Sequence, residues 1–181
     1  MKRLSYIFSF LLFINCNTKK VVATAVSEKT EKLIAAKRFT INCTTAYPMP
    51  TAALQAVANS GLIAPGNSVG QINISGSQNQ FKIMGDSIAV NLPYYGEQRM
   101  PGSRYGSTNN GIQFTGIPDD SDFSSVDNKG HRELNFTFKN DTEQCQARIQ
   151  IFPSGKSNIS INSSHRTSIR YTGQIKDSTN I

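Results

Sequence analysis

Apolar and polar residues alternate along most of the chain after residue 38, and this period of two is typical of β-strands with one buried face. The segment 39–46 is the clearest case, because Phe39, Ile41 and Cys43 share one face and polar residues occupy the other. Similar segments recur about every ten residues, between turns rich in Gly, Pro, Asn and Asp. The further strands that we predict are 68–75, 80–84, 88–92, 112–115, 131–139, 144–152, 158–162 and 167–175. The pattern indicates an all-β domain, mainly an antiparallel meander, folded as a sandwich or a small barrel.

Three segments depart from this alternation. Residues 21–37 are rich in Ala and Lys and contain no Gly or Pro, so we predict a short N-terminal helix or a mobile tether. Residues 51–59 follow two prolines, and Thr51 suits the N-cap of a short helix. Residues 116–128 combine turn residues with four aspartates, which predicts a solvated acidic loop.

The first fifteen residues have the pattern of an export signal. Lys2 and Arg3 form a positive start, and the apolar run 7–14 is shorter than the roughly 20 residues that cross a bilayer. Cys16 follows directly, where a lipoprotein signal places the cysteine that is lipidated. Acyl chains on this residue would anchor the protein to a membrane. The alternative is a cysteine within an ordinary cleaved leader.

These features predict the organisation of the chain. We expect a lipoprotein signal peptide over 1–15, the lipidated cysteine with a tether or helix over 16–38, and a single antiparallel β domain over 39–175. Residues 176–181 would form a flexible tail. The basic residues after Cys16, without an acidic run that resembles a surface-export signal, predict an outer-membrane anchor facing the periplasm.

Composition and charge narrow the partners only slightly. The formal net charge is +7, and removing the leader with its two basic residues leaves about +5. A modest positive charge suits anionic lipid headgroups or polyanionic glycans, although an ordinary solvated surface has the same balance. Export makes a nucleic-acid partner unexpected.

Lipidation of Cys16 would leave Cys43 and Cys145 as an even pair on the inward faces of two predicted strands. In an oxidising compartment they could form a disulfide across the core. Two buried thiols acting as small apolar residues is the other possibility, and the sequence leaves both open.

The residues for catalysis are few. His131 and His165 are the only histidines, and no Gly-x-Ser-x-Gly elbow is present. Zinc would need several closely spaced ligands, and Asp119, Asp120 and Asp122 lack the glycine and terminal glutamate of a calcium loop. We therefore expect neither an enzyme nor a metal or cofactor, and a hydrolase is the third functional hypothesis.

A group of tyrosines and arginines in and near the loop 85–111 is the best candidate for binding. Tyr and Arg suit recognition surfaces because each offers a flat face and hydrogen-bonding groups. The candidate residues are Tyr94, Tyr95, Arg99, Arg104, Tyr105, Arg166 and Arg170. Such a surface could hold a glycan, a lipid or an envelope protein, so the first hypothesis is a non-catalytic binding or accessory module. The second is a protein–protein interaction component of a larger envelope complex.

A structural role for the same residues is the alternative. In that arrangement Tyr94 and Tyr171 fill core positions, and Asp86 pairs with Arg166 or Arg170. Tyr and Arg side chains serve both purposes, so their spacing in the sequence does not choose between them.

Four short motifs resemble a known family. They are Gly85-Asp86-Ser87, Leu92-Pro93-Tyr94-Tyr95-Gly96, Gly111-Ile112-Gln113-Phe114, and the closing Arg166 with Ile169-Arg170-Tyr171-Thr172-Gly173-Gln174-Ile175. Over 39–175 the chain resembles the domain-of-unknown-function 4251 family of small lipoproteins from Bacteroidota. Tyr95 stands where that family is expected to have Phe, and the segment 51–65 is longer than usual. The resemblance implies an envelope location and a β architecture, and it implies no reaction and no site residue.

Overall fold

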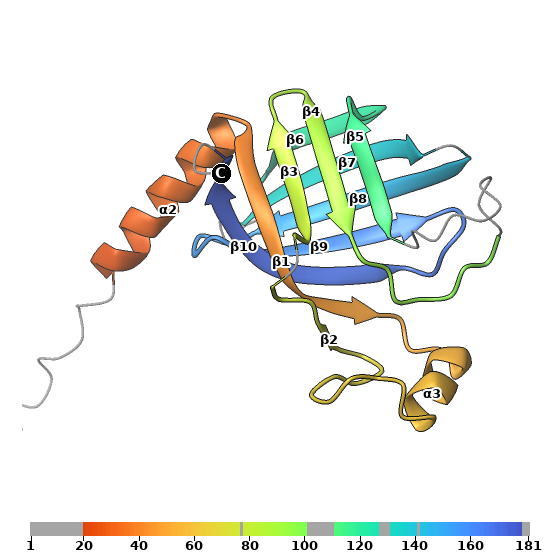
Figure 1. Ribbon diagram of the computed structural model, residues 1–181. Helices are drawn as coiled ribbons and strands as arrows, with labels where there is room; N and C mark the ends of the chain where they lie inside the picture. Colours follow the sequence, from red (N-terminus) through yellow and green to blue (C-terminus); the bar gives the residue numbers. More distant parts are fainter. Residues whose placement is uncertain (1–19, 77, 101–110, 127–130, 141, 179–181) are drawn as a thin grey trace, which may run out of the picture.

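The computed structural model describes residues 20–76, 78–100, 111–126, 131–140 and 142–178. These residues form one antiparallel sheet curled into a half-barrel, together with two helices (Figure 1). The helices are α2 (Lys20–Ala35) and α3 (Ala52–Asn59). The strands are β1 (Arg38–Pro48), β2 (Ile72–Asn73), β3 (Gln80–Met84), β4 (Ser87–Leu92), β5 (Ile112–Gly116), β6 (Asp120–Val126), β7 (Arg132–Asn140), β8 (Glu143–Ile151), β9 (Lys156–Ser163) and β10 (Ile169–Asp177). The all-β class predicted from the alternation is confirmed.

The strand order is β5-β4-β3-β1-β10-β9-β8-β7-β6, and β2 pairs only with β1. Neighbours on each side of the sheet are mostly consecutive along the chain, as in a meander. The exception is at the centre, where the first strand pairs with the last from Phe39↔Asp177 to Pro48↔Ile169. This central pair joins a run of four strands to a run of five.

The core lies on the concave face of the sheet. Phe39, Ile41 and Cys43 are buried as the alternation predicts, and so are the inward residues of β4, β7 and β8. Aromatic rings meet across the curl, because Phe114 of β5 lies 4.8 Å from Phe138 of β7 between ring centroids. Edge strand β5 therefore packs over the opposite side of the sheet rather than extending into solvent.

Three predicted segments differ in the structure. The segment 116–128 is not a loop throughout, because residues 120–126 form β6, which pairs with β7 around an irregularity after Asp122. Tertiary packing outweighs the turn-rich composition here, since Phe123 sits edge-on to Phe136 at 5.4 Å. The predicted strand 68–75 shortens to β2, and Lys176 belongs to β10 rather than to a flexible tail.

Helix α2 is a helix, one of the two predicted alternatives, and its C-terminal half packs on the domain. Thr30 and Ile34 are buried, and Glu31 accepts hydrogen bonds from Arg132 of β7 at 3.0 and 2.5 Å. These bonds raise the pKa of Arg132. Lys37, just after the helix, places its ammonium 4.5 Å from the centroid of the Phe123 ring. In the part of the chain that the structure describes, no helix is long and apolar enough to cross a membrane.

Helix α3 begins where the sequence predicts. Thr51 is its N-cap and accepts a hydrogen bond from the Leu54 N–H at 3.2 Å. The helix and the turns that lead to β2 project from the end of β1 (Figure 1).

Cys43 and Cys145 are free, buried thiols, so the structure has the second of the two predicted alternatives. Their strands are separated in the sheet by β10 and β9. Burial raises the pKa of each thiol to about 12, and the nearby carboxylate of Glu143 acts in the same direction on Cys145.

The packing of α2 predicts unequal effects of two substitutions. Ile34→Ala should lower the free energy of unfolding by about 2 kcal/mol, because it removes buried apolar contacts. Arg132→Ala should cost less than about 1 kcal/mol, because its ion pair with Glu31 is partly exposed to solvent. Urea denaturation measures both, and amide exchange should show α2 opening in Ile34→Ala. Equal, small effects would mean that α2 is not stably docked.

The thiols predict the behaviour of the core at high pH. With a pKa about three units above its ordinary value, each thiol should react with iodoacetamide at pH 8 roughly a thousandfold more slowly in the native than in the unfolded protein. The unfolded thiols ionise first as the pH rises, so stability should be complete below about pH 9 and fall between about pH 9 and 12. Labelling kinetics followed by mass spectrometry test this. Fast labelling of the native protein would contradict it.

Candidate functional site

The predicted tyrosine–arginine group forms a structural clamp in the part that is described. The Tyr94 hydroxyl lies 2.9 Å from the Thr167 carbonyl and 2.7 Å from the Thr167 hydroxyl. Gly96 lies against the same groups, because a Cβ at this position would be 2.3 Å from the Tyr94 hydroxyl oxygen. These contacts attach the segment after β4 to the segment before β10.

Arg166 completes the clamp. Its guanidinium lies over the Tyr94 ring at 5.1 Å, its Nε is 2.9 Å from Oε1 of Glu143, and its Nη1 donates to the Gly111 carbonyl at 3.3 Å. Glu143 also accepts a hydrogen bond from Ser163. Only 11% of the Arg166 side chain and 12% of the Glu143 side chain are exposed, so this is an internal ion pair. Arg166 therefore pairs with Glu143, where the structural alternative had expected Asp86.

The other candidate residues that the structure describes have different surroundings. Arg170 is exposed and lies over the Tyr47 ring at 5.1 Å, while Tyr95 is half-buried against the core. Arg99 is exposed, and its N–H donates to the His165 carbonyl at 2.7 Å. Arg104 and Tyr105 lie outside the described residues, as does Cys16.

Tyr171 occupies a core position, as the structural alternative expected. It is fully buried, and its hydroxyl donates to the Pro93 carbonyl at 2.7 Å. Burial raises the pKa of both Tyr171 and Tyr94.

The imidazole of His165 lies beside two hydroxyl groups. His165 Nδ1 is 2.7 Å from the hydroxyl of the adjacent Ser164, and its Nε2 is 3.4 Å from the Thr142 hydroxyl. The carboxylate in this cluster, Glu143, bonds instead to Ser163 and Arg166. Across the described residues, no three His, Cys, Asp or Glu side chains are grouped so that they could hold a metal ion.

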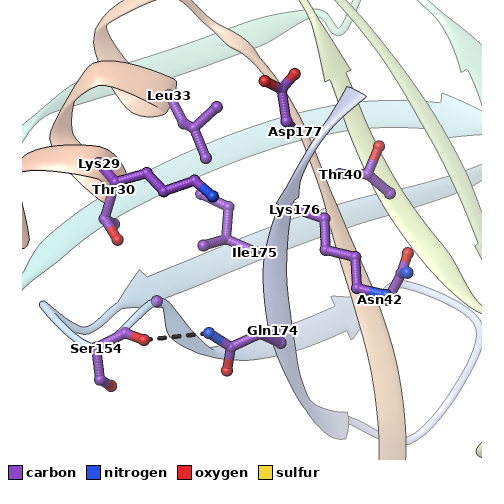
Figure 2. Close-up of a pocket in the computed structure, with 11 residues that line it drawn as sticks. Lys29, Thr30, Leu33, Thr40, Asn42, Ser154, Gln174, Ile175, Lys176 and Asp177 are labelled. Carbon is purple, nitrogen blue, oxygen red and sulfur yellow. Dashed lines mark hydrogen bonds between the residues drawn. The ribbon is translucent and has the colours of Figure 1, made fainter. Parts of the chain in front are cut away.

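A hollow lined by other residues lies on the outer face of β1 and β10 beside α2. Figure 2 shows side chains of α2 on one side of it and those of β1 and β10 on the other. A first cavity of about 510 Å³ adjoins a second of about 650 Å³, and the two share Ser154 and Gln174. We call these two adjoining cavities together the α2 groove. Its polar lining residues include Lys29, Thr30, Thr40, Asn42, Thr44, Ser154, Lys156, Asn158, Thr172, Gln174, Lys176 and Asp177.

The chemistry of the α2 groove is that of a polar binding site. Hydroxyl and amide groups alternate with three exposed lysines, Lys29, Lys156 and Lys176, against one carboxylate. Gln174 spans the middle, and its amide donates to the Ser154 carbonyl at 3.1 Å (Figure 2). Leu33 adds an apolar patch. Such a lining suits a hydroxylated ligand with negative charge.

Sequence reasoning missed this groove, because its residues come from α2, β1, β10, the start of β9 and the turn before it. The signal that was present is the run of polar outward positions in two strands. Thr40 pairs with Lys176, and Asn42 pairs with Gln174, so these positions form adjacent rows across the central strand pair.

Comparisons with known proteins agree with this fold. A family model described as "Domain of unknown function (DUF4251)" matches residues 23–175, which is most of the chain and includes most of α2. The crystal structure of a DUF4251 family protein from Bacteroides eggerthii is similar with a TM-score of 0.56 and 10% identity, covering 84% of this chain and 88% of that chain. No curated protein matches the chain. This protein therefore belongs to the DUF4251 family, as its four motifs suggest.

Proposed function

We propose that this protein is an exported, lipid-anchored and non-catalytic binding protein of the cell envelope, facing the periplasm from the outer membrane. Its ligand in this proposal is a hydroxylated anion such as an acidic glycan, held in the α2 groove. The observation that carries the proposal is the placement of three lysines among hydroxyl and amide groups in one groove. The leader and Cys16 support the anchor.

The choice of the α2 groove over the loop 85–111 follows from hydrogen bonding. In the loop and its surroundings, Tyr94 and Arg166 contact groups of the protein itself, and a ligand would have to displace those bonds. In the groove, Lys156 and Lys176 are exposed and extend from neighbouring strands. Binding there would not break the clamp.

Two other functions are less well supported. A docking partner that adds a strand would need a free sheet edge, but β5 packs against β7, and β6 carries Asp120 and Asp122 as edge-protecting charges. For a hydrolase, Ser164 and His165 would need a carboxylate beside the imidazole, and Glu143 is engaged by Arg166. The binding role therefore ranks first.

The anchor has a direct test. Wild-type protein purified from its own cell should carry acyl mass and partition into the detergent phase, because lipidated Cys16 holds it to the membrane. The Cys16→Ser variant should lack both properties. Intact-mass spectrometry and detergent partition measure them. A soluble wild type without acyl mass would overturn the lipid anchor.

The groove predicts a charge-dependent affinity. Lys176→Glu should weaken binding of an oligogalacturonate probe at least about tenfold, and added salt should weaken binding to the wild type. A neutral oligosaccharide of the same length should respond less to salt. Isothermal titration calorimetry measures each affinity. The matched control is Lys139→Glu, since Lys139 is an exposed lysine of β7 outside the α2 groove. Equal losses in both variants, or no binding to wild type, would contradict a ligand site in this groove.

A further inference from the structure

An apolar projection between β1 and β3 has no role in the proposed function. We call residues 49–71, which contain α3, the apolar arm. The surrounding stretch from Phe39 to Phe81 contains no Asp, Glu, Lys, Arg or His, although charged residues are frequent on both sides of it. A water-facing projection without a single charge is unusual for the surface of a soluble domain.

Three large apolar side chains of the arm are exposed. Leu62 is 76% exposed, Met49 43% and Val57 42%, and no residue of α3 is buried. Nothing in the described part of the chain covers them, so they add apolar surface in contact with water. Burial of that surface elsewhere would be favourable.

Helix α3 is capped at both of its ends, as a helix in a medium poor in water would need to be. The Thr51 hydroxyl caps the N-terminus, the Ser60 N–H donates to the Ala56 carbonyl at 3.1 Å, and the Ser60 hydroxyl donates to the Val57 carbonyl at 2.8 Å. These bonds satisfy groups at both helix ends that would otherwise cost free energy outside water.

The position of the arm relates it to the N-terminal anchor. In Figure 1, the N-terminal end of α2 lies at the left of the molecule, and the arm lies lower, at the right. An inclined flat surface seen edge-on in this view can touch both of them and leave the curled sheet on one side. A membrane that holds the lipidated N-terminus can therefore reach the arm without contacting the barrel.

The root of the arm carries residues that suit a membrane–water boundary. Arg170 of β10 is exposed and lies over the ring of Tyr47, two residues before the arm begins. Tyr is enriched at bilayer interfaces, and Arg is attracted by anionic headgroups. The order from root to tip is thus a cation, an aromatic ring and then uncharged residues.

We propose that the apolar arm inserts into the interface of the periplasm-facing leaflet of the membrane that carries the Cys16 anchor, and that Arg170 and Tyr47 lie at the headgroups. This inference rests on the proposed lipid anchor and adds a second attachment to it. Helix α3 is far too short to span a bilayer, so the arm lies in the interface. Two attachment points would fix the orientation of the domain, which a single flexible anchor would not.

A fluorescent label on the arm tests the insertion. The lipidated full-length protein with Leu62→Cys, labelled with an environment-sensitive dye, is reconstituted into vesicles of phosphatidylethanolamine and phosphatidylglycerol. The dye should shift its emission to shorter wavelength and lose quenching by iodide in water. It should gain quenching by lipids that carry a quencher near the headgroup. Cys43 and Cys145 are buried, so the introduced thiol takes the label.

The matched control is Ile117→Cys. Ile117 is 72% exposed, nearly the same as Leu62, and follows β5 at the end of the sheet where β1 begins, opposite the arm. Its label should behave as in water. In the labelled protein, Val57→Asp should reverse the shift of the Leu62 label without changing thermal unfolding, because Val57 is exposed.

The outcomes separate the two proposals. A protein without acyl mass overturns the anchor, and this inference with it. A lipidated protein whose Leu62 label is as accessible to iodide as the Ile117 label overturns the arm alone. A shift that grows with the density of protein in the vesicle indicates burial against a second copy, and this also overturns membrane insertion.

Discussion

The fold depends on the pairing of the first strand with the last. Hairpins build the remaining strands on either side, and among the described strands the ladder between β1 and β10 joins the two halves into one curled sheet. The approach is close at one point, where a Cβ on Gly173 would lie 2.3 Å from the Asn42 carbonyl oxygen and 3.0 Å from the Cys43 Cα. The register shifts there, between Cys43 and Thr45. A side chain at Gly173 would push the two strands apart, so this glycine is required by the central ladder.

The motifs that resemble the family have a structural explanation in the same region. Tyr94 and Gly96 pack on Thr167, and Tyr171 bonds to Pro93, so the segment after β4 is fastened to the segment that leads into β10. A tyrosine–arginine group in a sequence suggests recognition, because both residue types favour interfaces. Here the same properties, a flat ring and several donors, serve internal bonding. Shared motifs in this family can therefore preserve the fold without preserving a ligand.

The sequence predicts a strand well where one of its faces is buried. It predicts a segment poorly where contacts with distant segments determine the structure. The alternation identified β1, β3, β4 and β7 to β10 to within two residues at each end, and Thr51 identified the start of α3. The segment containing Asp120 and Asp122 was expected to be a loop. Its pairing with β7 depends on residues distant in the sequence, so no local pattern indicates it. The partner of Arg166 and the α2 groove were missed for the same reason. Glu143 is 23 residues from Arg166, and the groove takes its residues from both ends of the chain.

The elements on either side of β1 suggest which kind of ligand is compatible with both proposals. The α2 groove begins beside Thr40, near the start of β1, whereas the apolar arm follows Pro48 at its other end. With the arm in the membrane, Lys176, which pairs with Thr40, would be held away from the headgroups around the arm by most of the strand. Thr40 lies eight residues before Pro48, which is about 27 Å along the strand and about three Debye lengths at physiological salt. Headgroups around the arm would then neither contact Lys176 nor attract it strongly. At this end of the groove, a soluble acidic glycan fits the geometry better than a lipid of the anchoring membrane.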